Sequence, residues 1–202
     1  MIILDGESAR AEAAKTIRRG GVIGYRTDTL YGLGGDPLNA QAVRKIIELK
    51  GREDGKPILL LISDLEVIPR YLAQTSETFE TIADRFWPGP LTLIGEARKD
   101  LPEDLTAGTK TLGLRLPDSP EVWDLVRACG GALTATSANP SGKPPALTAS
   151  EVEKYFPEID LIIDGGTVRA TDPSTVLDVS SSQVYLLREG AIKRGELAEW
   201  LA

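Results

Sequence analysis

The sequence predicts an α/β protein in which helices cover a mixed, twisted β-sheet. The first half of the chain alternates amphipathic helical stretches with short apolar strands, and the second half is richer in strands. Residues 58–62 form an unbroken apolar run of strand length, which is typical of a central strand buried on both faces. At 202 residues the chain fits one domain over residues 1–202.

The N-terminal elements follow from helical periodicity and from residues that begin or end a helix. Apolar residues recur at helical spacing after residue 7, basic residues come late in the stretch, and Gly20-Gly21 end it. Asn39 has the side chain of a helix N-cap. In chain order we expect a helix over 7–19, a strand over 22–25, a loop over 27–35, a helix from Asn39 to the cationic segment 50–57, and a strand over 58–62.

The second half is divided by proline, glycine and capping residues. Ser119-Pro120 is a typical helix start, and Thr148 with Glu151 matches a capping box. In chain order we expect two short helices between 64 and 86, strands over 91–94 and 111–116 around a polar loop at 100–110, a helix over 119–130, a strand over 132–136, a loop over 137–145, a helix over 148–157, strands over 161–163, 174–177 and 184–187, and a closing helix over 195–201.

The composition narrows the chemistry. The chain has no histidine and one cysteine, Cys129, which excludes a Ser-His or Cys-His pair, a histidine zinc site and an internal disulfide. We interpret Cys129 as a small core thiol. The net charge of −7 argues against a protein whose main task is to grip a nucleic-acid backbone. Without a secretory signal or a run of ~18 apolar residues, we expect a cytoplasmic protein with no membrane contact.

Polar side chains follow several of the expected strands, at the sheet edge where open α/β sheets bind ligands. Thr27 and Thr29 follow one strand, and Ser137 and Asn139 follow another. Clustered cations in an acidic chain indicate a polyanionic ligand such as a nucleotide. An alternative stays open, in which Lys50, Arg52 and Lys56 are solvent-exposed cations at the C-terminus of a helix. The cations expected at the cleft are Lys50, Arg52, Lys56, Arg115 and Arg188.

Two familiar phosphate-binding patterns are not present. A P-loop needs Ser or Thr after its Gly-Lys, whereas Gly142-Lys143 is followed by Pro144. The dinucleotide-binding pattern Gly-x-Gly-x-x-Gly would begin at Gly32-Leu-Gly34, but Pro37 stands in the place of its last glycine. The residues alone therefore predict an anion-binding α/β protein without histidine.

Four segments between about residues 12 and 190 form a specific combination. They are Thr27-Asp-Thr-Leu-Tyr-Gly-Leu-Gly34, Lys50-Gly-Arg52 with Lys56-Pro57, Thr136-Ser-Ala-Asn139 with Ser141-Gly142, and Pro173-Ser-Thr-Val176. Together they resemble the single-domain threonylcarbamoyl-AMP synthase (YrdC-like) family. The resemblance implies a YrdC-like sheet with an open cleft. It also implies a reaction of L-threonine, bicarbonate or CO2, and ATP that yields threonylcarbamoyl-AMP and pyrophosphate, the first step toward N6-threonylcarbamoyladenosine at position 37 of tRNA.

The resemblance also implies roles for single residues. Lys50 and Arg52 match the positions expected to be catalytic, and Mg²⁺ would arrive with ATP, without a protein metal site. The expected ATP contacts are Lys50, Arg52, Lys56, Thr111, Ser137, Asn139 and Arg188. The expected threonine contacts are Thr29, Arg115, Thr134 and Ser174.

The resemblance implies partners and leaves alternatives open. Its product would pass to a threonylcarbamoyl transferase complex that acts on tRNA, and weak tRNA binding is a further expectation. Many relatives carry a pocket histidine where this chain has Leu61, so a related amino acid remains a candidate substrate. An RNA-binding or ribosome-maturation factor of the same fold is the main alternative. A carbamoyl-transfer module of the hydrogenase-maturation type is a third.

Overall fold

The computed structural model describes residues 1–51, 57–169 and 172–201, and the elements below are those of these residues. The strands are β1 (Ile2–Leu4), β2 (Ile23–Arg26), β3 (Tyr31–Gly34), β4 (Leu59–Ile62), β5 (Leu91–Glu96), β6 (Thr111–Arg115), β7 (Ala132–Ser137), β8 (Leu161–Asp164), β9 (Thr175–Asp178) and β10 (Tyr185–Arg188). The helices are α1 (Glu7–Arg18), α2 (Ala40–Lys50), α3 (Glu77–Phe86), α4 (Glu103–Thr106), α5 (Pro120–Ala128) and α6 (Ala149–Tyr155), with 3₁₀ turns η1 (Leu65–Arg70) and η2 (Arg194–Leu197).

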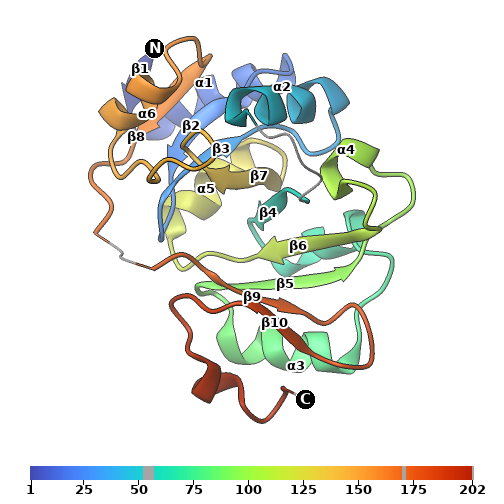
Figure 1. Ribbon diagram of the computed structural model, residues 1–202. Coiled ribbons are helices and arrows are strands. Elements are labelled where there is room, and N and C mark those ends of the chain that lie inside the picture. Colours follow the sequence, from blue (N-terminus) through green and yellow to red (C-terminus); the bar gives the residue numbers. More distant parts are fainter. Residues whose placement is uncertain (52–56, 170–171, 202) are drawn as a thin grey trace.

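The described strands form one twisted sheet in the order β1-β8-β2-β3-β7-β4-β6-β5-β9-β10. β1 and β8 lie at one end of the molecule, and β9 and β10 lie at the other (Figure 1). The sheet is mixed, with parallel pairs such as β2 with β8 and antiparallel pairs such as β2 with β3. The predicted mixed sheet with flanking helices is confirmed.

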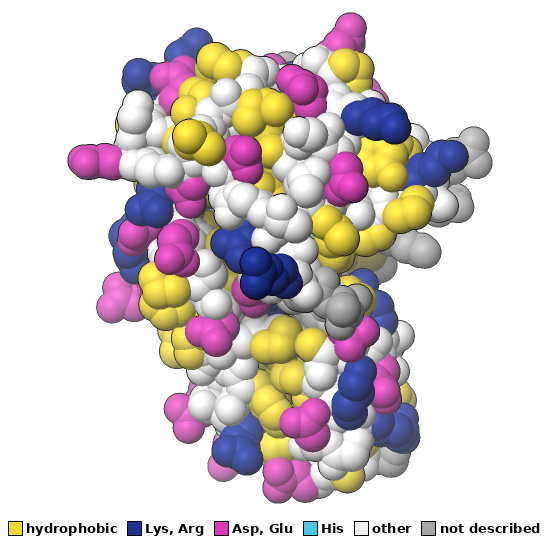
Figure 2. All heavy atoms as spheres, turned by 90° about the vertical axis from the view of Figure 1, so that its left-hand side faces the viewer, with side chains coloured by type: hydrophobic (Ala, Val, Ile, Leu, Met, Phe, Trp, Pro, Cys, Tyr) yellow, Lys and Arg dark blue, Asp and Glu magenta, His cyan; other side chains and the backbone are white. Residues whose placement is uncertain are grey.

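Strand β7 belongs to both halves of this sheet. Its residues Ala132 to Ala135 pair antiparallel with β4, whereas Thr136 and Ser137 pair antiparallel with β3. The outline of the molecule narrows between an upper and a lower part (Figure 2). One strand therefore connects the two halves through hydrogen bonds to each.

The core lies on both faces of the sheet, as the apolar run at 58–62 predicts. Leu60 and Ile62 of β4 pack in one apolar cluster with α2, α3 and α6, whereas Leu61 packs in a second cluster with α1 and α5. Side chains of a strand alternate between its faces, so helices cover the sheet from both sides. No helix of the described residues is long and apolar enough to cross a bilayer.

The expected loop over 27–35 is partly wrong, because it contains strand β3. Tyr31 and Leu33 have no exposed surface and alternate with Gly32 and Gly34. A Cβ atom on Gly34 would lie 2.8 Å from Cε1 of Tyr25, so close packing requires glycine there. Glycine-rich strands lack the branched side chains by which strands are usually predicted.

Other differences are confined to short elements. The polar stretch 100–110 contains α4, and the expected closing helix over 195–201 is reduced to the turn η2, after which Leu201 bridges to Val184. Strand β1 was not predicted. The Thr148 capping box is confirmed, and the Asn39 side chain accepts N–H bonds from the first turn of α2. Ser119 precedes α5, but its hydroxyl bonds to Glu121 instead of capping the helix.

Candidate functional site

A cavity of about 900 Å³ lies where β3, β4, β6 and β7 meet. Alternate residues of β6 line it, namely Thr111, Gly113 and Arg115, because they share one face of the strand. Among the described residues that line the cavity there is no aspartate or glutamate. The structure brings together at this cavity the predicted residues Thr29, Lys50, Thr111, Arg115, Ser137, Asn139, Ser174 and Arg188.

Some predicted residues are not brought to the cavity. Arg52 and Lys56 lie outside the described residues. Thr134 is buried and is not among the described residues that line the cavity, so the structure does not bring it to the cavity with the other predicted threonine contacts. Its Oγ1 instead accepts the N–H of Gly35 at 2.8 Å and lies 3.4 Å from the carbonyl oxygen of Leu33. The Thr134 hydroxyl therefore fastens β7 to the end of β3.

A turn closed by Thr27 shapes one end of the cavity. Its Oγ1 accepts the backbone N–H groups of Thr29 and Leu30, both at 3.1 Å, and donates to the carbonyl of Leu30 at 2.7 Å. Thr27 and Thr29 are both buried. A threonine hydroxyl bonded to backbone two and three residues ahead fixes such a turn locally. The turn holds the Thr29 hydroxyl at the cavity wall.

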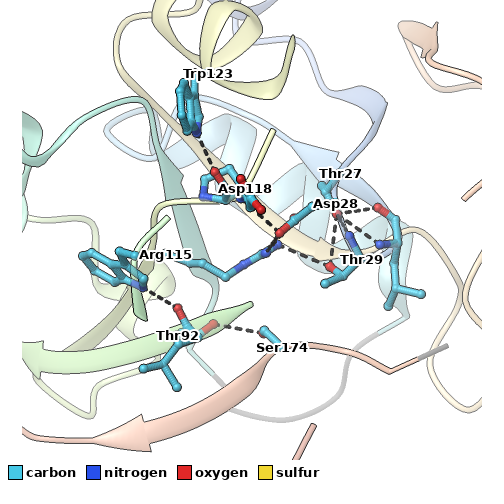
Figure 3. Close-up of polar contacts among 12 residues, drawn as sticks. Thr27, Asp28, Thr29, Thr92, Arg115, Asp118, Trp123 and Ser174 are labelled. Atoms are coloured by element: carbon cyan, nitrogen blue, oxygen red, sulfur yellow. Dashed lines mark hydrogen bonds and ion pairs between the residues drawn. The ribbon is translucent and has the colours of Figure 1, made fainter. Parts of the chain in front are cut away.

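Arg115 forms a buried ion pair with Asp28 at this end (Figure 3). Its Nη1 lies 2.6 and 2.7 Å from the two carboxylate oxygens, and Nη2 donates to Thr29 Oγ1 at 3.3 Å. The side chains are 6% and 11% exposed. Asp28 also accepts the N–H of Asp118 at 3.3 Å. Sequence reasoning missed Asp28 although it lies inside the Thr27 to Gly34 motif.

Ser174 links two further polar residues of the cavity. Arg188 donates from Nε and Nη2 to the Ser174 carbonyl at 3.1 and 2.8 Å, and from Nη2 to its Oγ at 3.1 Å. On the other side, Ser174 Oγ lies 3.0 Å from Oγ1 of Thr92, as Figure 3 shows. Burial lowers the pKa of Arg188, and repulsion from Arg115 lowers it further. The guanidinium groups of Arg115 and Arg188 are therefore close enough to repel each other.

Lys50 contacts the end of β7 and the loop that follows it, another part of the cavity wall. It ends α2 and is buried, and its Nζ donates to the carbonyl of Ser137 at 2.7 Å and approaches Ser137 Oγ at 3.2 Å. Asn139 Oδ1 lies 3.5 Å from the same ammonium. The Asn139 amide donates to the carbonyls of Pro140 and Lys143 at 3.0 and 2.7 Å. Asn139 therefore organises the loop after β7 as well as facing Lys50.

Two groups with raised pKa values are not nucleophile candidates. Burial raises the pKa of the Cys129 thiol to about 12, which keeps it protonated, and Cys129 does not line the cavity. Burial, helped by Asp164, raises the pKa of Tyr31 to about 12. The Tyr31 hydroxyl donates to the carbonyl of Gly166 at 2.8 Å. The loop 164–166 thus holds the hydroxyl of Tyr31, which lines the cavity.

Comparisons with known proteins place the chain in a family. The Sua5/YciO/YrdC family model, described as "Telomere recombination", matches residues 15–190. A threonylcarbamoyl-AMP synthase of Thiobacillus denitrificans is 37% identical over 178 residues, which are 88% of this chain and 95% of that protein. The synthase of Pyrococcus abyssi is 37% identical over 92% of this chain and 55% of its own length, and that of Bacillus subtilis is 38% identical over 93% and 55%. The chain thus spans about half the length of the latter two relatives.

Solved structures show the same fold. The crystal structure of P. abyssi Sua5 complexed with L-threonine matches with a TM-score of 0.94 at 34% identity, covering 100% of this chain and 61% of that one. The crystal structure of Escherichia coli YciO matches with a TM-score of 0.85 at 26% identity and covers 98% of that chain. From the match over residues 15–190 and these relatives, we conclude that the chain belongs to the Sua5/YciO/YrdC family.

Proposed function

We propose that this protein is an L-threonylcarbamoyladenylate synthase, a nucleotidyltransferase that uses L-threonine, bicarbonate or CO2, and ATP. The observation that carries the proposal is one cavity whose lining includes two arginines, a buried lysine and several hydroxyls, in a chain whose relatives are named threonylcarbamoyl-AMP synthase. We do not favour an RNA-binding factor, since those names support the enzyme.

The amino acid is assigned to the end of the cavity that holds Arg115, Thr29 and Ser174. A guanidinium can bind both oxygens of a carboxylate, and Arg115 has donors beyond those used by Asp28 and Thr29. The Thr29 and Ser174 hydroxyls flank it. The solved P. abyssi relative in complex with L-threonine supports this choice of ligand.

The nucleotide is assigned to the part lined by Lys50, Ser137, Asn139, Thr111 and Arg188. Positive charge and hydroxyl groups suit phosphate oxygens. Arg52 and Lys56 stay predictions as further phosphate contacts. The described residues that line the cavity offer no carboxylate ligand for Mg²⁺. We propose that the ion enters as part of the MgATP substrate, with phosphate and water oxygens as ligands.

The reaction then needs positioning and charge more than proton transfer. The threonine amine adds to CO2 to give a carbamate with loss of a proton. A carbamate oxygen attacks the α-phosphorus of ATP, the bond from that phosphorus to the bridging oxygen breaks, and pyrophosphate leaves. Holding the reactants in line can supply about 7–11 kcal/mol of the barrier, and cations stabilise the developing phosphate charge. Neither effect requires histidine, of which the chain has none.

Leu61 bears on the choice of amino acid. It lines the cavity and is the strand partner of Arg115, so an apolar side chain stands at the amino-acid end. An apolar wall discriminates weakly between isosteres that differ by a hydroxyl. We therefore propose threonine as the main substrate and valine as its closest competitor. The downstream transferase complex and weak tRNA binding remain proposals that follow from the product.

The test is incubation of the protein with MgATP, bicarbonate and each amino acid in turn. Pyrophosphate release is measured, and the adenylate product is identified by mass. We expect threonine-dependent pyrophosphate and a threonylcarbamoyl adenylate. If no amino acid releases pyrophosphate while a duplex RNA or a tRNA binds at physiological salt, the RNA-binding function would replace this one.

A further inference from the structure

Thr92 is a buried hydroxyl residue that lies behind the Ser174 side chain. It comes from β5, next to β6, and has no exposed surface. A Cβ placed on Gly113 would lie 3.0 Å from Cγ2 of Thr92, so the methyl group packs over this glycine. The hydroxyl points instead toward Ser174, with an Oγ1 to Oγ distance of 3.0 Å (Figure 3).

The direction of this hydrogen bond follows from the partners of each hydroxyl. Among the described residues, Ser174 Oγ is the sole hydrogen-bond partner of Thr92 Oγ1. Thr92 borders the cavity but has no exposed surface, so if Ser174 donated, the Thr92 proton would have no acceptor among the described residues, which costs about 1–3 kcal/mol. Thr92 is therefore the donor. Arg188 can only donate, so its Nη2 occupies the other acceptor position of Ser174 Oγ.

The Ser174 proton remains after both lone pairs have accepted a hydrogen. Ser174 lines the cavity, so its hydroxyl presents that proton to a ligand there. We propose that Thr92 is a positioning residue that presets the Ser174 hydroxyl as a hydrogen-bond donor to a carboxylate oxygen of the amino acid. The inference deepens the proposed function and rests on it. Thr92 borders the cavity but has no exposed surface, so its effect on the ligand is assigned to Ser174.

This arrangement prepares the site before the substrate binds. A serine hydroxyl without fixed partners rotates among several orientations, and a ligand must select one of them. With two donors directed at its oxygen, Ser174 has one orientation left. The expected effect of Thr92 is therefore on the KM for the amino acid and not on the KM for ATP.

The test uses Thr92→Val, which keeps the shape and removes the hydroxyl. We expect the KM for threonine to rise about fivefold to tenfold, with the KM for ATP changed less than twofold. Thr92→Ser retains the hydroxyl and should restore the KM to within about twofold. Thr106→Val is the matched control, because Thr106 is buried, bonds to the carbonyl of Glu103 and lies away from the cavity.

A double-mutant cycle tests whether Thr92 acts through Ser174. Ser174→Ala, Thr92→Val and the double variant are compared, with thermal melting to confirm the fold. We expect the double variant to have the same KM for threonine as Ser174→Ala alone. Additive effects, or an unchanged KM in folded Thr92→Val, would overturn the inference. Absence of threonine-dependent turnover in the unmodified protein would instead overturn the proposed function.

Discussion

The two arginines of the cavity are held by different kinds of partner. Arg115 is paired with the carboxylate of Asp28, and both side chains are nearly buried. Arg188 donates to the carbonyl and hydroxyl of Ser174 and forms no salt bridge with a described residue. The charge of Arg115 is thus balanced by a carboxylate at the amino-acid end, whereas no described carboxylate pairs with Arg188 at the proposed nucleotide end.

This difference matches the charges of the proposed substrates. An amino acid brings one carboxylate, for which a guanidinium directed by Asp28 and Thr29 is sufficient. A triphosphate brings several negative charges and needs cations that the protein has not already neutralised. Burial and repulsion from Arg115 lower the pKa of Arg188, although its guanidinium stays charged. An anion bound beside Arg188 would offset this repulsion.

Removing the carboxylate of the paired arginine should have the largest effect. Asp28→Ala leaves Arg115 buried without its counter-ion, and we expect the free energy of unfolding to fall by about 3–5 kcal/mol. Urea unfolding measures it. Asp104→Ala is the matched control because its 2.8 Å pair with Arg44 is exposed, and it should cost less than about 1 kcal/mol. Similar losses in the two variants would show that the Asp28 pair is not special.

Neutralising the other arginine should affect binding and spare the fold. Arg188→Met removes a charge that no described carboxylate balances and also the hydrogen bonds to Ser174, so the free energy of unfolding should fall far less than in Asp28→Ala. The KM for ATP should increase about tenfold or more, since charge-assisted bonds to phosphate are lost. Steady-state kinetics with both substrates measures the effect. A stability loss as large as that of Asp28→Ala would remove the contrast between the two arginines.

Salt should change the KM for MgATP more than the KM for threonine, and this is the smallest of the expected effects. Between about 0.05 and 0.5 M salt we expect the KM for MgATP to rise several-fold, because screening weakens attraction between a net positive surface and phosphate. The KM for threonine should change less than about twofold, since Arg115 is already paired. Kinetics in potassium chloride and in potassium glutamate control for specific anion binding. Equal salt dependence would contradict the assigned charge balance.

Sequence patterns predicted the parts of the site that follow strands. Ser137 and Asn139 come directly after an apolar strand, so their place at the cavity could be expected from the order of elements. Lys50 ends a helix with a clear N-cap, and its position follows from the length of that helix. For these residues, local structure decides which side of the molecule they face.

The missed residues depend on partners far away in the chain. Asp28 meets Arg115 across 87 positions, and Thr92 meets Ser174 across 82 positions. No local pattern marks such a pair, because sheet order and register bring the residues together. Thr134 is the opposite case. It was predicted to contact the ligand, but its hydroxyl is hydrogen-bonded to the backbone of Leu33 and Gly35. Predicting that contact would require knowing that β3 lies beside β7.

Strand β7 has a mechanical consequence for the cavity that it helps to line. It is hydrogen-bonded to β3 through one part and to β4 through the other, so the two walls share one continuous backbone. The two walls therefore cannot move apart as separate bodies. The width of the cavity changes only when β7 bends or twists. We expect the amide hydrogens of β7 to be among the slowest in the chain to exchange with deuterium, because their exposure requires that β7 separate from both β3 and β4.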